Sequence, residues 1–532
     1  MRSRFFSRFL LISALAASPL HAAVSLPADN SAALPAEVEG PAKAAMEAFQ
    51  SGRHAKAIEL ATPLAQQGNA EALYLLGFAS ETGQGVEASK DKALEYYRKA
   101  AEAKHKDAIY RMSFILLASE KEAERDQARE ALEKAAKDDP AVAGRILGEA
   151  YLRGLLTPTA DPDKALYWWK QAADAGDVLS VLLMARFYEG QFGFPELKNL
   201  KESLANYAKA AGLGNAGAMA ALGSRLLSGD EKNRDEAKGR EWLKKAIAAK
   251  EYSAYLALGD YEENVKKDNK AALAEYERGK DAGQVDCMLR AADFYLEGKG
   301  VEKDEDRGKN LLLKAAEAGS PVANLRVAAA LLSAEKPAPA DVMSGYGHLL
   351  AAANGNLAQA QNELGLLYLS GKLGLADSPA GVAWLTRAAQ GGNAQAQNNL
   401  ATLYERGLGG VQRSIENAGQ LYSLAANQGH GPATLALARL INEGIGTKAD
   451  PSKAWALATL AGERGEKDGD ALAKEIGQKF DEKQRVEAMK QLEELKSPKP
   501  AAKKEETKPA APKTGGGKLE LPKTDAAKPA KP

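Results

Sequence analysis

The 532-residue sequence is poor in the side chains that build most catalytic and metal sites. It has one cysteine, Cys287, and five histidines. A single cysteine excludes an intramolecular disulfide and any zinc cluster made of cysteines. The histidines downstream of His21 lie far apart and show no HExxH spacing; they are His54, His105, His348 and His430. We therefore expect no metal site and no cofactor.

Long apolar runs are absent beyond the N-terminus, so we expect no transmembrane segment in the mature chain. The first residues carry arginines, then an apolar run from Phe9 to Ala17, then small residues near Ala22. This order is typical of a secretory signal peptide, and the run is short for a membrane anchor. We predict a signal peptide over residues 1–22, cleaved near Ala22, and a periplasmic or secreted protein. A linker containing Pro27 and Pro35 follows over residues 23–40.

The formal net charge is +0, but the charges are unevenly distributed. Ten lysines and four acids lie between Lys496 and Lys531, which leaves the body of the chain acidic. An acidic body argues against a nucleic-acid partner. Residues 496–532, rich in lysine, proline and alanine, predict a disordered tail. The tail either contacts anionic cell-wall polymer weakly or is a solubilising extension without a function of its own.

Catalytic motifs are also missing: there is no GxSxG, no phosphate-binding GKS and no kinase set. Gly212 to Gly217 matches GxGxxG, but the stretch follows a predicted helix, so we interpret it as a turn. Cys287 occupies a slot held elsewhere by alanine, which predicts a small buried residue. The acid pairs Glu262/Glu263 and Asp304/Glu305 lie in loops or near helix starts, where acids offset the helix dipole. We predict no catalytic residue; a hydrolase built on such carboxylates is the alternative.

The sequence does contain a repeated unit, seen most clearly from Asn393 to Gly429. Apolar and small residues follow helical spacing from about Ala394 to Arg406 and from about Ile415 to Asn427. Glycines between and after these stretches predict turns. Each unit is therefore expected to be a pair of helices.

Copies of this unit recur at a period of about 36 residues, which indicates a solenoid of helix pairs. They begin near Asn69, Lys106, Pro140, Asp177, Asn215, Tyr252, Gln284, Ser320, Leu357, Asn393 and His430. Tyr96, Trp168, Trp242 and Trp384 share one slot in the second helices. We expect these aromatic side chains to fill the gap between helix layers.

Three stretches carry a resemblance to a known family. They are LGFASETGQGV with DKALEYYRKAAE at 76–102, LGEAYLRG with DKALYWWKQAADAG at 147–176, and LGLLYLSG with AWLTRAAQGG at 364–392. They resemble Sel1-like repeats, relatives of the tetratricopeptide repeats. The resemblance implies an all-α, right-handed α-solenoid of about eleven repeats over residues 69–465. Residues 41–68 and 466–495 would then cap its ends. The units from Lys106, Tyr252 and Ser320 depart from the pattern, so the repeat count is least defined there.

Two groups of residues are candidates for protein binding. The first comprises amides on the first helices of neighbouring units: Gln361, Asn362, Gln397, Asn398 and Asn399. In families that resemble this chain, the first helix lines the concave face, where amides hold a partner's backbone; the same amides also belong to the repeat pattern. The second is Phe192 and Phe194, in the loop from Gly190 to Leu197. These two rings either form a contact site or pack over the adjacent helix.

These observations favour a non-enzymatic interaction scaffold of the bacterial envelope, with a protein or peptide on its concave face. By resemblance, its pathway would be secretion, polysaccharide export, envelope signalling or host contact. The alternative is a cell-wall-linked enzyme or accessory protein acting on peptidoglycan. A third possibility, a carbohydrate-binding module, would depend on the basic tail.

Overall fold

The computed structural model describes residues 40–229, 234–334, 337–374 and 376–496. These residues form 26 α-helices and no strand, which confirms the predicted all-α class. The predicted signal peptide, the predicted linker up to residue 39 and the predicted tail beyond Lys496 lie outside the described residues. No helix in the described part of the chain is both long and apolar enough to cross a bilayer.

The chain divides into two units, the first ending at Leu357 and the second beginning at Ala358. The helices of the first unit are α2 (Lys43–Gln50), α3 (His54–Gln66), α4 (Ala70–Thr82), α5 (Lys90–Glu102), α6 (Lys106–Leu117), α7 (Glu122–Asp138), α8 (Pro140–Leu152), α9 (Pro162–Asp174), α10 (Val178–Glu189), α11 (Leu200–Gly212), α12 (Ala216–Ser228), α13 (Glu236–Ala248), α14 (Ser253–Tyr261), α15 (Asn269–Asp281), α16 (Val285–Glu297), α17 (Glu305–Glu317), α18 (Pro321–Leu332) and α19 (Pro339–Asn354). Those of the second unit are α20 (Ala358–Ser370), α21 (Ser378–Gln390), α22 (Ala394–Arg406), α23 (Ile415–Asn427), α24 (Gly431–Glu443), α25 (Pro451–Glu463), α26 (Lys467–Gly477) and α27 (Glu482–Lys496).

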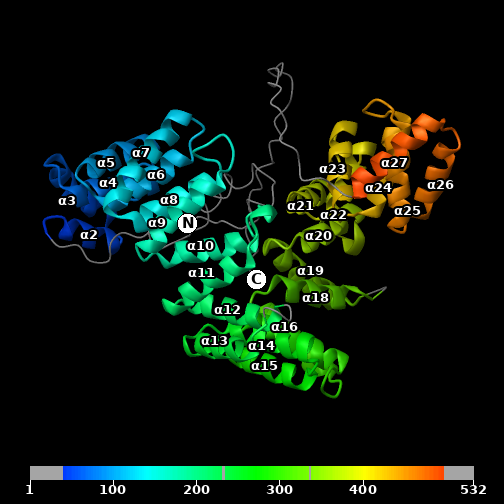
Figure 1. Cartoon of the computed structure of the whole chain (residues 1–532), viewed down its shortest axis with the longest axis horizontal. Helices are drawn as coiled ribbons and strands as arrows, with labels where there is room; N and C mark the ends of the chain where they lie inside the picture. Colours follow the sequence, from blue (N-terminus) through cyan, green and yellow to red (C-terminus); the bar gives the residue numbers. More distant parts are fainter. Residues whose placement is uncertain (1–39, 230–233, 335–336, 375, 497–532) are drawn as a thin grey trace. The chain divides into compact units, whose positions relative to one another are not determined.

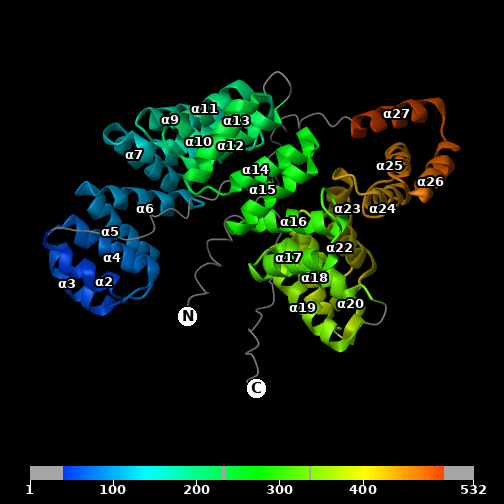
Figure 2. The ribbon, with the colours of Figure 1, turned by 90° about the horizontal axis from the view of Figure 1, so that it is seen from below.

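Within each unit, successive helices pack side by side in chain order (Figures 1 and 2). In the first unit each even-numbered helix packs on the odd-numbered helix that follows it, and the pairs stack on one another. In the second unit α25 carries both α26 and α27 at the end of the stack. Each unit is therefore a solenoid of helix pairs, as the repeat period predicts.

The helix ends follow from local chemistry. Asn69, Asn215 and Asn393 each precede a first helix, and each side-chain oxygen accepts a hydrogen bond from the backbone N–H three residues on, at 2.8–2.9 Å. The turn glycines Gly214 and Gly429 both have a φ of 88°, a conformation that favours glycine. The same chemistry thus restarts the chain at several of the turns between repeats.

The aromatic slot lies one residue later than the sequence predicts. Tyr97 and Trp169 are fully buried, whereas Tyr96 and Trp168 are only half-buried. Trp242 and Trp384 are half-buried in the same way, with Leu243 and Leu385 buried beside them. Adjacent residues point about 100° apart on a helix, so one register step separates the core face from its margin.

The buried rings fit because the facing first helix carries a glycine. A Cβ on Gly259 would lie 2.2 Å from Cε1 of Tyr276, and one on Gly148 would lie 2.4 Å from Trp169. Alanine at these positions would clash with the ring, so glycine sets the close approach of the two helices.

The three divergent stretches still form helix pairs: α6 with α7, α14 with α15, and α18 with α19. In the second of these, α14 continues as a π-helix over Glu262–Lys266, where the sequence has a shortened loop. Loss of the loop glycines therefore changes the connection and leaves the pairing intact.

Candidate functional site

Two of the amides predicted from the sequence, Asn362 and Asn399, meet on the first helices of the second unit. Asn399 of α22 donates through Nδ2 to Oδ1 of Asn362 in α20, at 3.0 Å. Gln395, one turn before Asn399, donates through Nε2 to Asn399 Oδ1 at 3.1 Å. Oε1 of Gln395 lies 3.0 Å from Nε2 of His430, at the start of α24. We call Asn362, Asn399, Gln395 and His430 the amide ladder; it joins three consecutive repeats.

Gln397 is not part of the amide ladder and instead connects two successive helices. It is 4% exposed, donates to the carbonyl of Ala389 at 3.1 Å and accepts from Gln428 at 2.8 Å. Asn324 of the first unit, in the equivalent position, bonds the carbonyl of Ala316 in the same manner. Amides in this slot therefore tie a first helix to the end of the preceding second helix.

The predicted amides thus differ in what a partner can reach. Gln361, Asn362 and Gln397 are buried, whereas Asn398 and Asn399 are half-buried. Gln395 is exposed, and His430 is half-buried. Sequence reasoning missed these last two, although Gln395 stands one helical turn from Asn399, the spacing at which side chains meet on a helix.

Phe192 and Phe194 belong to an aromatic cluster of the first unit. Phe192 is 2% exposed, and its ring lies 6.2 Å from Trp169 and 6.4 Å from Phe187. Phe194 is half-buried, 5.9 Å from Phe187. The rings pack over the end of α10, which is the second of the two alternatives, and Phe192 offers no surface to a partner.

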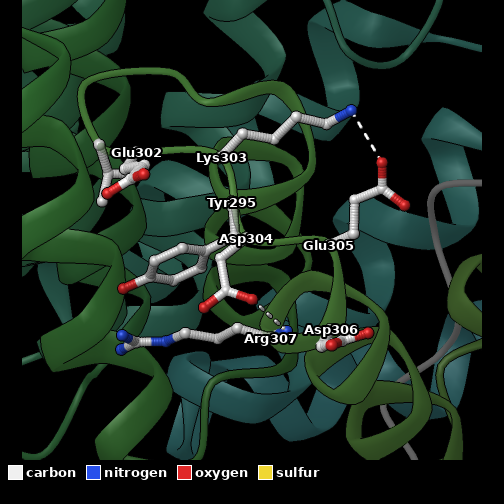
Figure 3. A pocket seen from close by; sticks show the side chains of 8 residues that line it. Tyr295, Glu302, Lys303, Asp304, Glu305, Asp306 and Arg307 are labelled. Carbon is white, nitrogen blue, oxygen red and sulfur yellow. Dashed lines mark hydrogen bonds and ion pairs between the residues drawn. The ribbon is translucent and has the colours of Figure 1, made fainter.

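A surface hollow of about 610 Å³ lies at the start of α17 (Figure 3). It is lined by Tyr295, Val301, Glu302, Lys303, Asp304, Glu305, Asp306 and Arg307. Asp304 caps the helix by accepting from the Arg307 N–H at 2.9 Å, and Lys303 pairs with Glu305 at 2.8 Å. The Arg307 guanidinium lies 4.0 Å above the Tyr295 ring and pairs with Glu277. The charges of Lys303, Asp304, Glu305 and Arg307 are therefore used in capping and ion pairs.

Other candidates from the sequence also have structural roles. Cys287 is fully buried, as predicted, and burial raises its thiol pKa to about 12, which suppresses the reactive thiolate. Glu262 pairs with Arg240, and Glu263 with Lys299 and Tyr276. Gly212 ends α11 and Gly214 forms the following turn, as predicted. Within the described residues, no three histidine, cysteine or acidic side chains gather as a metal site would require.

Helix pairs that stack in chain order, each contacting its neighbours, define the class of α-solenoid repeat proteins. The family profile described as the Sel1 repeat matches residues 70–105, 145–177, 180–215, 216–250, 285–320, 358–393, 394–430 and 431–466. These matches cover more than half of the chain, which belongs to the Sel1 repeat family. Most of the unmatched residues between the repeats fall in the three divergent helix pairs.

No curated protein matches the chain. Among solved structures, it is similar to a protective antigen of uropathogenic Escherichia coli displaying an SLR fold, with 22% identity over 82% of this chain and 94% of that chain (TM-score 0.34). It is also similar to a Sel1 repeat protein from Oxalobacter formigenes, with 24% identity over 77% and 98% (TM-score 0.33). Yeast Tom70 matches at 15% identity over 85% and 94% (TM-score 0.32).

Proposed function

We propose that the chain is a non-enzymatic scaffold of the bacterial envelope that holds a protein or peptide partner on the first helices of its second unit. Sel1 repeat proteins generally mediate protein–protein interactions. The observation that carries the proposal is the amide ladder. Its two middle members, Gln395 and Asn399, reach solvent beside Asn398. Side-chain amides donate and accept hydrogen bonds, so they suit an extended peptide backbone.

The ladder also supports the proposal through preorganisation. Asn399 and Gln395 are held by each other and by Asn362 and His430. Binding to side chains already held in place loses less conformational entropy than binding to mobile ones. A partner would therefore meet polar side chains of α22 that are already held in place from α20 and α24.

The test is affinity capture from the native envelope with the mature protein as bait. We expect Gln395→Ala combined with Asn398→Ala to weaken retention of a partner at least tenfold, because both positions reach solvent on α22. Gln420→Ala, an exposed glutamine on the second helix α23, is the matched control and should retain the partner fully. Equal retention by all three baits would refute this binding surface.

The envelope location is inferred from the N-terminal sequence alone. N-terminal sequencing of protein from the periplasmic or secreted fraction should give a mature chain that starts just after Ala22 or Ala23. Recovery of the chain only in the cytoplasm, with residues 1–22 attached, would refute export and leave the binding surface untouched.

The lysine-rich residues 496–532 are proposed to add a weak, salt-dependent contact with anionic cell-wall polymer. Truncation after Leu495 should abolish retention of the protein on such polymer at low salt. Unchanged retention would remove the tail from the account.

A further inference from the structure

His430 acts as the cap of a helix, a position usually taken by asparagine, aspartate or serine. Its Nδ1 accepts a hydrogen bond from the backbone N–H of Ala433 at 3.2 Å. The equivalent residue one repeat earlier is Asn393, which caps α22 through Ala396 at 2.8 Å. His105 caps α6 in the first unit in the same way, through Ala108 at 3.3 Å. Histidine therefore fills the capping slot twice, once in each unit.

The backbone donor determines where the His430 ring carries its proton. A backbone N–H can only donate, so Nδ1 must be the unprotonated acceptor nitrogen. The proton of the neutral ring is then on Nε2, which donates to Oε1 of Gln395 at 3.0 Å. All donors of the ladder consequently point one way, from His430 through Gln395 and Asn399 to Asn362.

Protonation of the ring would be incompatible with this cap. A second ring proton on Nδ1 would face the Ala433 N–H, so two donors would meet. The imidazolium charge would also lie at the positive end of the α24 dipole. Neither effect arises with asparagine, which does not titrate in this range.

Two charged groups beyond α24 lie near this corner. Glu466, at the start of α26, favours the charged ring, and its side chain lies against Gly431. Arg464, from the turn before α26, donates to Thr434 Oγ1 at 2.7 Å. On the α22 side the ring contacts the neutral Gln395. Burial outweighs Glu466, and the pKa of His430 lies below its ordinary value.

We propose that His430 is a proton-sensitive helix cap, which holds the start of α24 and the end of the amide ladder in neutral solution and releases the α24 cap in acid. Because the ring binds its proton more weakly in the folded chain, the unfolded chain takes up the proton first. The contribution of the cap is complete above the unfolded pKa of about 6.5 and is lost as pH falls through the folded pKa.

Hydrogen exchange of the full chain, read by mass spectrometry at pH 7.5 and pH 5.0 and normalised to unstructured rates, tests this proposal. Loss of a helix cap raises the equilibrium constant for local opening of the helix start about fivefold. We expect the first turn of α24, including the Ala433 amide, to lose about fivefold in protection at pH 5.0. The first turn of α22, capped by Asn393, should keep its protection and serves as the internal control.

The matched variant is His430→Asn, which copies the cap of α22. Its α24 should show the same protection at both pH values. Protection that persists at pH 5.0 in the unmodified chain, or an equal loss in the asparagine variant, would overturn the proposal. Histidine labelled with ¹⁵N gives a second readout: a neutral His430 ring carrying its proton on Nδ1 would overturn the proposal as well.

Discussion

Glu149 lies in the interior of α8 with 4% of its surface exposed. Its Oε2 has no hydrogen-bond partner within the described residues. Burial raises the pKa of the carboxyl to about 7, and the nearby Arg153 and Arg145 only partly offset this. A carboxyl whose folded-state pKa is raised contributes stability that is complete below the unfolded pKa of about 4.3. This contribution is lost as pH rises through about 7.

Glu149→Gln should therefore stabilise the chain in alkaline solution. At pH 8.5 the variant should unfold with a free energy higher by about 1–3 kcal/mol, since each unit of pKa shift corresponds to about 1.4 kcal/mol. At pH 5 the two proteins should differ little, because the native carboxyl is then neutral. Urea unfolding followed by circular dichroism at both pH values measures this. Glu130→Gln, at an exposed position on α7, is the control and should shift nothing; a gain there as large as at Glu149 would contradict the burial argument.

Glycines in helix interiors differ in whether a neighbouring side chain packs against them. The Gly259 Cα faces the Tyr276 ring, whereas a Cβ on Gly347 in α19 would meet nothing within 4 Å. Gly259→Ala should destabilise the first unit by about 1–3 kcal/mol through overpacking. Gly347→Ala should stabilise it by about 0.5–1 kcal/mol, because alanine favours the helix. Thermal unfolding of the two variants compares them directly, and the same sign for both would contradict the assignment.

At the scale of elements, neighbouring helices pack through two alternative seams. In the polar seam a glutamate near the end of the first helix accepts from a buried tyrosine of the second: Glu81 with Tyr97, Glu189 with Tyr207, Glu263 with Tyr276 and Glu405 with Tyr422. In the apolar seam a leucine takes the place of the glutamate and packs on a glycine: Leu227 on Gly239, Leu296 on Gly308 and Leu369 on Gly381. The residues within each seam therefore match one another.

Replacing only one residue of a polar seam should destabilise the chain. Arg225 of the next repeat donates two hydrogen bonds of 2.6 Å to the Glu189 carboxylate. Burial raises the pKa of the Tyr207 hydroxyl to about 12. Glu189→Leu leaves the arginine and the tyrosine hydroxyl without their acceptor, which should cost about 2–4 kcal/mol.

Adding Tyr207→Leu, Ser203→Gly and Arg225→Leu, which converts the site to the apolar seam, should recover most of that loss. Chemical unfolding of the single and quadruple variants provides the measurement. A quadruple variant no more stable than the single one would show that the two seams are not interchangeable.

The loops between helices depend on a glycine that touches the preceding repeat. A Cβ on Gly300, whose φ is 69°, would lie 2.6 Å from the carbonyl carbon of Asn269 at the start of α15. Gly283 has a φ of 85° but nothing within 4 Å. Gly283→Ala should lower the free energy of unfolding by about 1 kcal/mol through backbone strain alone. Gly300→Ala should lower it further, because the added Cβ would also clash with Asn269. Equal losses of melting temperature would mean that the loop contact carries no energy.

The sequence predicts the helices well because the same pattern recurs in many repeats, so deviations in a single copy do not obscure it. The bounds expected for Ala394–Arg406 and Ile415–Asn427 are those of α22 and α23. It places the aromatic slot at Trp168, whereas Trp169 is buried, because helical periodicity does not separate adjacent residues at the margin of a face. The sequence predicts part of the amide ladder. Asn362 and Asn399 stand out as amides, but the capping role of His430 depends on which ring nitrogen faces Ala433.

At the scale of the whole molecule, each unit is a one-dimensional stack whose last pair must have one face that tolerates water. In the second unit α25 is covered by α26 and α27 together, with Ile476, Phe480 and Ala488 buried in the same cluster as Leu457. The opposite side of α27 is polar apart from the exposed Val486 and Met489. The stack therefore depends on α27 to close its core.

Truncation before Glu482 should destabilise the second unit, because it uncovers the apolar side of α25 and exposes Phe480. At about 25 cal/mol per Å², burial of even two large side chains is worth several kcal/mol, so the melting transition of this unit should fall by several degrees and the protein should self-associate. Truncation after Lys496 removes residues that the composition predicts to bury nothing, and it is the matched control. Calorimetry with light scattering on both truncations would contradict the capping role of α27 if the shorter chain melted at the same temperature as the longer one and stayed monomeric.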